Sequence, residues 1–191
     1  MTALSDDRRL HGHLIGQQGS RRALNTPVLV LDLDVLDRNI ATMAELAAKA
    51  GIRLRPHAKT HKSVDIARRQ VAAGAVGLCC AKLGEAEVLA EGGIEGLHIT
   101  SPVVSGPAIA RLMALNARTE RLSVVADHPD NMAALAAAAS PETPLGVFVD
   151  IDPGIRRTGV VSDEAAVALA RQIAEAPGLA YEGVQKYCGR E

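Results

Sequence analysis

The sequence contains few aromatic residues, few cysteines and no long apolar run. Its three cysteines are Cys79 and Cys80, which are adjacent, and Cys188 near the C-terminus, so neither a disulfide framework nor a CxxC metal-binding spacing is present. No apolar segment approaches the roughly 18 residues of a membrane span. Arg, Asp and His also occur where a secretory signal would be apolar. We therefore expect packed or free thiols, no membrane partner and a cytoplasmic protein.

The charges show no excess of either sign. The chain has 21 basic and 22 acidic residues among 191, which argues against a nucleic-acid-binding surface or an acidic tail. Apolar residues make up 48% of the chain, enough to bury one sizeable core. One globular domain, or part of a larger one, that acts on a small molecule is the simplest expectation.

From residue 27 onward, short apolar segments alternate with longer, Ala-rich segments of helical spacing. This alternation is typical of βα units, which build a parallel sheet. The predicted strands cover residues 27–33, 52–58, 76–81, 96–101, 121–126, 145–151 and 181–187. Residues 1–26 show no such period and are predicted to form an irregular arm.

Local capping signals place the helices between these strands. Asp34 is suited to cap a helix over 35–50, and Gly51 follows where a C-terminal cap is expected. Further helices are predicted from about Gly84 to the glycine pair at 92–93, and from Asp163 to about residue 176.

Repeated βα units of this length build either a (β/α)8 barrel or an open doubly wound sheet. No G-x-G-x-x-G motif follows the first predicted strand, which weakens a dinucleotide-binding version of the open sheet. A complete barrel takes about 200–250 residues and eight strands, more than this chain provides.

The segment 52–59 reads Ile-Arg-Leu-Arg-Pro-His-Ala-Lys and alternates strictly between apolar and basic side chains. If the apolar face meets the helices, Arg53, Arg55, His57 and Lys59 point into the barrel. Burial of unpaired cations is costly, so this arrangement favours an anionic ligand with many oxygens, such as a phosphorylated cofactor. Lys59, at the strand end, is then placed to form a Schiff base. A half-exposed edge strand with a solvated basic face fits the alternation equally well.

A family resemblance extends this argument. Arg-Pro-His-Ala-Lys-Thr-His-Lys at 55–62, preceded by Thr-Pro-Val-Leu-Val-Leu-Asp-Leu-Asp at 26–34, resembles the D-threonine aldolase and D-serine dehydratase family. Its members are pyridoxal-phosphate enzymes of fold type III. Similar segments at 77–81, 84–87 and 99–102 follow in the same order, so the resemblance runs from about residue 25 to the end of the chain. It implies a (β/α)8 TIM-type barrel of the alanine-racemase N-terminal type.

The resemblance implies roles for individual residues. The family's lysine at the position of Lys59 holds pyridoxal phosphate, an electron sink for cleavage of a bond to Cα. Arg157, in the segment 149–159, falls where related barrels place an arginine at the phenolic oxygen of the cofactor. Its alternative reading is an exposed loop arginine paired with Asp150 or Asp152.

The segment 183–189 gives a third match. By the resemblance Tyr187 flanks the cofactor ring, and Gln185 lies beside it on the same face of the strand. Ordinary packing of the tyrosine at the rim of the core is the alternative reading.

Four further polar residues near the expected site receive no assigned role. His57 and His61 lie on either side of Lys59, as candidate proton carriers or phosphate neighbours. Asp127 and His128 face the expected mouth of the barrel, but a helix cap explains them equally well.

The resemblance also implies missing parts. The strand at 27–33 would pair with a C-terminal β domain, so residues 27–191 would supply about six of eight barrel strands. The last two strands, the groups that cradle the phosphate, and the ligands of the family's divalent metal would lie beyond Glu191. An open barrel has two unpaired edges. We therefore expect a fragment, a truncated gene product or half of a split protein, with weak cofactor binding and no metal site of its own.

For the parent protein the resemblance implies a lyase on D-3-hydroxy-amino acids, which it cleaves by a retro-aldol reaction to glycine and an aldehyde or keto acid. Dehydration of D-serine or 3-hydroxyaspartate is the first alternative. A non-catalytic pyridoxal-phosphate-binding protein, or an inactive fragment, is the second. The expected partner is a small D-amino acid, and the expected full-length assembly is a homodimer.

Overall fold

The computed structural model describes residues 6–188. The chain divides into two units, Met1–Asn39 and Ile40–Glu191. The division falls within helix α2 (Leu33–Lys49), later in the chain than the arm boundary predicted at residue 26. Among the described residues, no helix combines the length and apolar character needed to span a bilayer.

The first unit contains short helical turns where the sequence predicts an irregular arm. Helix α1 covers Asp6–His11, and the 3-10 helices η1 and η2 cover Gly12–Leu14 and Ser20–Ala23. Residues 1–5 of the predicted arm lie outside the described residues. Residues 6–14 and 20–23 of the predicted arm therefore form short helical turns, and a separate arm over 1–26 stays a prediction. Turns this short need only hydrogen bonds between near neighbours, such as Ile15 N–H to Gly12 O, and leave no long period to detect.

The predicted strand at 27–33 is wrong. Residues 27–32 belong to no strand, and Leu33 is already part of α2. The apolar side chains of Leu29, Val30 and Leu31 are exposed, that of Leu29 fully. A strand exists only through its ladder of hydrogen bonds. No other segment among residues 6–188 pairs with this one.

The predicted helix over 35–50 is confirmed as α2, but its cap is different. Asp32 Oδ1, not the Asp34 side chain, accepts a hydrogen bond from the Val35 N–H at 3.0 Å. Asp34 lies in the first turn, where its negative charge interacts favourably with the helix dipole. Gly51 has φ +65°, as expected for a left-handed residue that ends a helix.

The second unit contains one sheet of five strands in the order β1-β2-β3-β4-β5. Every neighbouring pair is parallel, which confirms the βα pattern and five of the predicted strands. Three strands, β1, β2 and β3, are shorter than predicted. The bounds are β1 (Cys79–Cys80), β2 (His98–Ile99), β3 (Ser123–Ala126), β4 (Leu145–Ile151) and β5 (Leu179–Lys186).

The predicted strand at 52–58 is only partly formed. It runs beside β1 as a sixth parallel segment, with hydrogen bonds from Val76 N–H to Leu54 O and from Cys79 N–H to Pro56 O. His57 alone forms a bridge, to Cys79. Pro56 has no N–H to donate, and no described segment pairs with the other edge. Its hydrogen bonds with the residues around β1 keep the segment beside the sheet. The missing N–H of Pro56 and the unpaired outer edge prevent a full strand.

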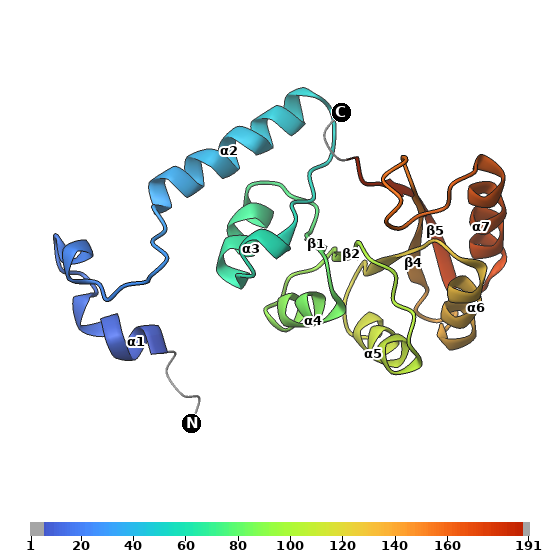
Figure 1. Ribbon diagram of the computed structural model, residues 1–191, viewed down its shortest axis with the longest axis horizontal. Helices are drawn as coiled ribbons and strands as arrows, with labels where there is room; N and C mark the ends of the chain where they lie inside the picture. The colour runs from blue at the N-terminus through green and yellow to red at the C-terminus, as the bar shows by residue number, and fades with distance from the viewer. Residues whose placement is uncertain (1–5, 189–191) are drawn as a thin grey trace. The chain divides into compact units, whose positions relative to one another are not determined.

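Five helices follow one another in an arc along one face of the sheet (Figure 1). They are α3 (Val64–Ala72), α4 (Leu83–Glu91), α5 (Gly106–Asn116), α6 (Pro129–Ala138) and α7 (Asp163–Glu175). α4 and α7 match the predicted helices. Alternate strand residues such as Ile99, Val124 and Val147 pack against helix residues such as Leu112 and Ile173 in one apolar core.

The face of the sheet opposite the helices, called the inner face from here on, carries polar side chains. Arg53 and Arg55 line a cavity of about 460 Å³ together with Ser123 and Phe148, so the two arginines point to the inner face, as predicted. Arg55 Nε is buried and has no hydrogen-bond partner. The apolar face of the same segment is less regular. Its Ala58 is buried in the core, whereas Ile52 is 64% exposed, contrary to prediction.

Candidate active site

Lys59 lies in a short turn at the carboxyl end of the bridged segment. The 3-10 helix η3 (Ala58–Thr60) follows His57, whose Nδ1 accepts the Lys59 backbone N–H at 3.3 Å. Ala58 is 1% exposed and anchors the turn in the core, while the Lys59 side chain is exposed. The Thr60 hydroxyl donates to His57 O at 3.1 Å. These contacts therefore hold the backbone on both sides of Lys59 and leave its side-chain amine accessible.

Lys59, Arg157 and Tyr187 lie together, although each comes from a different part of the chain. Lys59 Nζ lies 5.9 Å from the centre of the Tyr187 ring, and the Arg157 guanidinium carbon lies 4.4 Å from it. Tyr187 directly follows β5, and Arg157 lies in the loop after β4. All three are therefore at the carboxyl ends of parallel segments, where barrel enzymes build their active sites. The 460 Å³ cavity lies toward the opposite ends of the strands, near Leu122 and Pro144.

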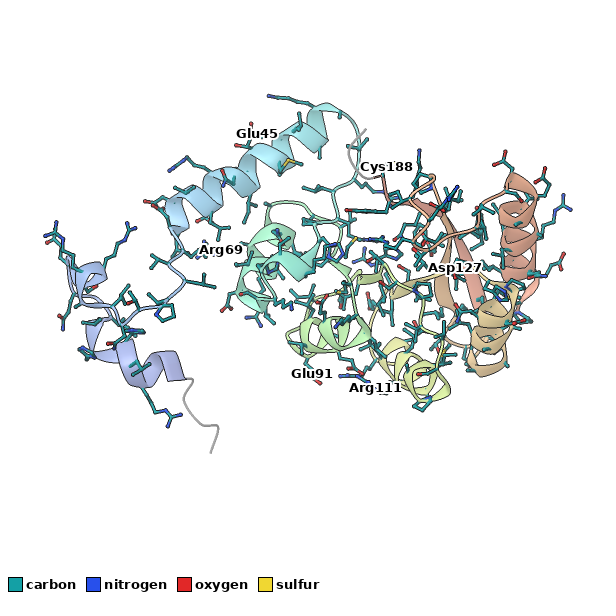
Figure 2. All side chains as sticks on the ribbon, viewed as in Figure 1. Glu45, Arg69, Glu91, Arg111, Asp127 and Cys188 are labelled. Atoms are coloured by element: carbon teal, nitrogen blue, oxygen red, sulfur yellow. The ribbon has the colours of Figure 1, made fainter. Side chains whose placement is uncertain are left out.

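The loop that carries Arg157 is held by two carboxylates. Asp152 Oδ1 accepts the backbone N–H groups of Gly154 at 2.9 Å and Arg156 at 3.0 Å. Asp127, which follows β3 and is labelled in Figure 2, accepts the Gly159 N–H through Oδ2 at 3.0 Å. The two contacts fix the loop before and after the arginine.

Arg157 forms no ion pair with Asp150 or Asp152 in the described part of the chain. Asp152 is occupied by the loop N–H groups, and Asp150 accepts from Gln185 Nε2 at 2.9 Å. The guanidinium lies over an aromatic ring instead. The loop-ion-pair alternative therefore has no support in the structure.

Gln185 is the centre of a polar network on the inner face of the sheet. Its Nε2 donates to Asp150 Oδ1 at 2.9 Å and to Thr100 O at 3.3 Å, and its Oε1 lies 2.9 Å from His98 Nε2. His98 Nδ1 lies 2.9 Å from Ser123 Oγ. The network joins β2, β3, β4 and β5. Both N–H donors of Gln185 are engaged and its amide oxygen contacts His98, so one acceptor position on that oxygen is its remaining hydrogen-bonding capacity.

His98 is a buried neutral imidazole. It is 5% exposed, and burial lowers the pKa of its side chain to about 4, although the hydrogen bond with Gln185 acts in the opposite direction. Because Gln185 Oε1 can only accept, His98 Nε2 carries the proton and Nδ1 accepts from the Ser123 hydroxyl. Its ring also packs edge-on against Phe148, with centroids 4.7 Å apart.

His98, Thr100 and Asp150 are not among the site residues that the sequence predicts. A signal was available for His98, because it alternates with the buried Leu97 and Ile99 and must point to the inner face. Nothing in the sequence alone showed that Gln185 would reach it, since 87 residues separate the two.

The remaining polar candidates are structural. His128 Nδ1 accepts the Asp130 N–H at 3.2 Å and caps α6, so the helix-cap reading is the one observed. His61 Nδ1 accepts the Ser63 N–H at 3.0 Å, and burial lowers the pKa of the His61 imidazole. The cysteines are free, as predicted, with Cys80 buried and Cys188 exposed.

This fold and site define a protein class. The chain matches the family described as alanine racemase, N-terminal domain, over residues 31–190, and it belongs to that family. The match confirms the α/β fold class and the barrel type. In the described residues the barrel is represented by an open parallel sheet rather than a closed one.

The chain is also similar to individual enzymes with known reactions. A 3-hydroxy-D-aspartate aldolase of Paracoccus denitrificans is 44% identical over 170 residues, which cover 88% of this chain and 44% of the relative. A D-threo-3-hydroxyaspartate dehydratase of a Delftia species is 36% identical over 80% of this chain and 40% of the relative. The crystal structure of a D-threonine aldolase from Filomicrobium marinum superposes with a TM-score of 0.80 at 41% identity, over 85% of this chain and 44% of that chain. The chain thus spans less than half the length of these relatives, and the resemblance to the aldolase and dehydratase family is confirmed.

Proposed function

We propose that this chain is the cofactor-attaching part of a pyridoxal-phosphate-dependent lyase that cleaves the Cα–Cβ bond of D-3-hydroxy-amino acids. The products are glycine and an aldehyde or keto acid. The observation that carries this proposal is the meeting of Lys59 and Arg157 over the Tyr187 ring. The aldolase names of the Paracoccus and Filomicrobium relatives support the reaction type.

The residues at this end of the sheet fit pyridoxal phosphate, a flat, anionic aldehyde. Lys59 offers an amine, Arg157 a cation for an oxygen anion, and Tyr187 a ring to pack against the cofactor. No carboxylate among residues 6–188 forms an ion pair with either cation, so both remain available to a ligand. Arg55, whose Nε is buried and unpartnered, lines the cavity toward the opposite strand ends and is not counted in this group.

Each of these side chains would contact a different part of the cofactor. Lys59 would hold the cofactor through its amine, and Arg157 would keep the phenolic oxygen anionic through a charge-assisted hydrogen bond. Tyr187 would pack beside the ring, and Gln185 would face it through its amide oxygen. When bound, pyridoxal phosphate supplies the electron sink for the bond broken at Cα.

A dehydratase is the second candidate, favoured by the 36% identity to the Delftia dehydratase. A non-catalytic pyridoxal-phosphate-binding protein, or an inactive fragment, is the third. Among the described residues, no group of three His, Cys, Asp or Glu side chains is arranged to bind the divalent metal of the family. A cytoplasmic homodimer acting on a small D-amino acid remains the prediction for the whole protein.

Cofactor attachment is tested by mixing the 191-residue chain with pyridoxal phosphate and recording the visible band of the lysine adduct. Borohydride reduction then fixes the adduct, and peptide mass spectrometry locates it. We expect the modification on Lys59 and its loss in Lys59→Ala. Lys82→Ala is the matched control, because Lys82 is an exposed lysine directly before α4.

Two results would contradict the proposed attachment site. An adduct that persists in Lys59→Ala would come from other exposed lysines, which also react with aldehydes, and not from a site at Lys59. The absence of any adduct in the unmodified chain would favour the inactive fragment.

The reaction itself is tested on the product of the whole open reading frame that contains this sequence. With D-threonine as substrate, the aldolase proposal predicts glycine and acetaldehyde. Ammonia with 2-oxobutanoate would instead establish the dehydratase. The oligomeric state of the same protein, measured by light scattering, tests the homodimer.

A further inference from the structure

His57 lies between the Lys59 backbone and the end of strand β2. Its Nδ1 accepts the Lys59 N–H at 3.3 Å, and its Nε2 lies 3.3 Å from Thr100 Oγ1. One imidazole ring therefore joins the turn that carries the lysine to a residue 43 positions away in the sequence.

The contacts of His57 define its protonation. The Thr100 hydroxyl donates to Cys80 O at 3.1 Å, so its oxygen can accept a hydrogen bond from His57 Nε2–H. Nδ1 accepts the Lys59 N–H and therefore carries a lone pair. A neutral imidazole with its proton on Nε2 satisfies both contacts.

The surroundings of His57 favour this neutral form. Burial, and then the positive charge of Lys59, lower the pKa of the His57 imidazole, while Glu85 acts in the opposite direction. His98, also neutral through burial, is a further titratable group near His57. Protonation of His57 would place an N–H on Nδ1 opposite the Lys59 N–H and break the contact.

We propose that His57 is a positioning residue for Lys59: its imidazole ties the Lys59 N–H to the Thr100 hydroxyl and so fixes the lysine turn at the end of the sheet. This inference rests on the proposed role of Lys59. The Lys59 side chain has four rotatable bonds, so the position of its backbone determines where its amine can reach. Ala58 holds the turn in the core from the other side.

The chain offers a matched control for the same type of contact. His128 Nδ1 also accepts a backbone N–H two residues later, that of Asp130, at 3.2 Å. His128→Ala therefore removes an equivalent hydrogen bond at the start of α6. An effect specific to Lys59 must appear in His57→Ala and not in His128→Ala.

The first experiment needs no cofactor. The 191-residue chain is labelled with 15N-histidine, and the ring nitrogens of His57 are followed by NMR near neutral pH. We expect a neutral ring protonated on Nε2. A ring protonated on Nδ1, or on both nitrogens, would overturn the proposal.

The second experiment compares His57→Ala with His57→Asn. An asparagine side chain can accept an N–H two residues later, so it restores the contact to Lys59 but not the one to Thr100. In His57→Ala we expect the Lys59 amide to exchange with solvent about tenfold faster and the adduct at Lys59 to form about tenfold more slowly. His57→Asn should recover most of both losses, and His128→Ala should cause neither.

The outcomes separate this inference from the proposed function. If the unmodified chain forms no adduct at Lys59, the proposed function fails, while NMR and amide exchange still decide whether His57 holds the turn. If the adduct forms and His57→Ala changes neither its rate nor the Lys59 exchange rate, the positioning role alone is overturned.

Discussion

The Arg157 guanidinium lies 4.4 Å from the centre of the Tyr187 ring. Both side chains are exposed, so this cation–π contact stabilises the fold by only about 0.5–1 kcal/mol. Such a weak contact does little to explain why the loop should be held by Asp127 and Asp152 on both sides of the arginine. The two carboxylates instead fix the backbone from which the guanidinium extends, as the proposed contact with an anionic oxygen requires.

Replacing Arg157 should therefore affect the cofactor more than the fold. We expect Arg157→Ala to change the free energy of unfolding by less than about 1 kcal/mol. The same variant should weaken pyridoxal phosphate binding by about tenfold or more, because a hydrogen bond to a charged group is lost. Denaturant titration measures the first effect and the visible band of the adduct measures the second. Arg171→Ala, on the exposed side of α7, is the control and should leave both unchanged; equal cofactor affinity in the two variants would contradict the role of Arg157.

Two glycines of the same loop give a matched pair for the loop geometry. Gly154 and Gly159 have nearly equal φ values, +104° and +103°. A Cβ at Gly154 would meet nothing within 4 Å, whereas one at Gly159 would overlap the backbone nitrogen of Asp152. Ala at either position pays the strain of positive φ, but only Gly159→Ala adds a backbone clash.

We accordingly expect Gly159→Ala to destabilise the chain by at least about 1 kcal/mol more than Gly154→Ala. Thermal unfolding of the two variants measures the difference. Equal melting temperatures would show that the chain after Gly159 shifts freely, contrary to the hydrogen bond from its N–H to Asp127.

The sequence was sufficient for features that depend on local pattern. Alternating apolar segments located β3, β4 and β5, and glycine and acidic signals located α4 and α7. The family motif brought Lys59, Arg157 and Tyr187 together, which spacing alone does not do. Local pattern failed at 27–33, where strong β-formers lie in an exposed segment without a partner. Whether an apolar run becomes a strand depends on a neighbour that the run itself does not encode.

The inner-face network could not be predicted for a related reason. Gln185 reaches His98, Thr100 and Asp150 only because the curved sheet brings three strand ends together. Each of these residues has an ordinary local context in the sequence. Their hydrogen bonds follow from strand register, which is set by pairing across the whole sheet.

The thiols provide a simple test of burial. Cys188 is exposed, whereas burial raises the pKa of the Cys80 thiol to about 12 and also raises that of Cys79. Because the thiolate is the reactive form, an aromatic disulfide reagent should modify Cys188 rapidly, Cys79 slowly and Cys80 only on unfolding. Cys188→Ser should remove the fast phase. A fast phase that survives this substitution would show that the β1 thiols are accessible.

The buried His98 makes stability depend on pH. Its ordinary pKa is 6.5, and burial lowers the pKa in the folded chain to about 4. Between these values the unfolded chain binds more protons than the folded chain, so the free energy of unfolding must fall as pH falls through this window. The full gap corresponds to at most about 3 kcal/mol, and the lowered pKa values of His57 and His61 act in the same direction. His98→Gln keeps a polar side chain and removes one titrating group, so denaturant titrations between about pH 4 and pH 7 should show a shallower decline for the variant than for the unmodified chain. Parallel declines would mean that His98 is protonated as easily in the folded chain as in water, which its 5% exposure and its bonds to Ser123 and Gln185 do not allow.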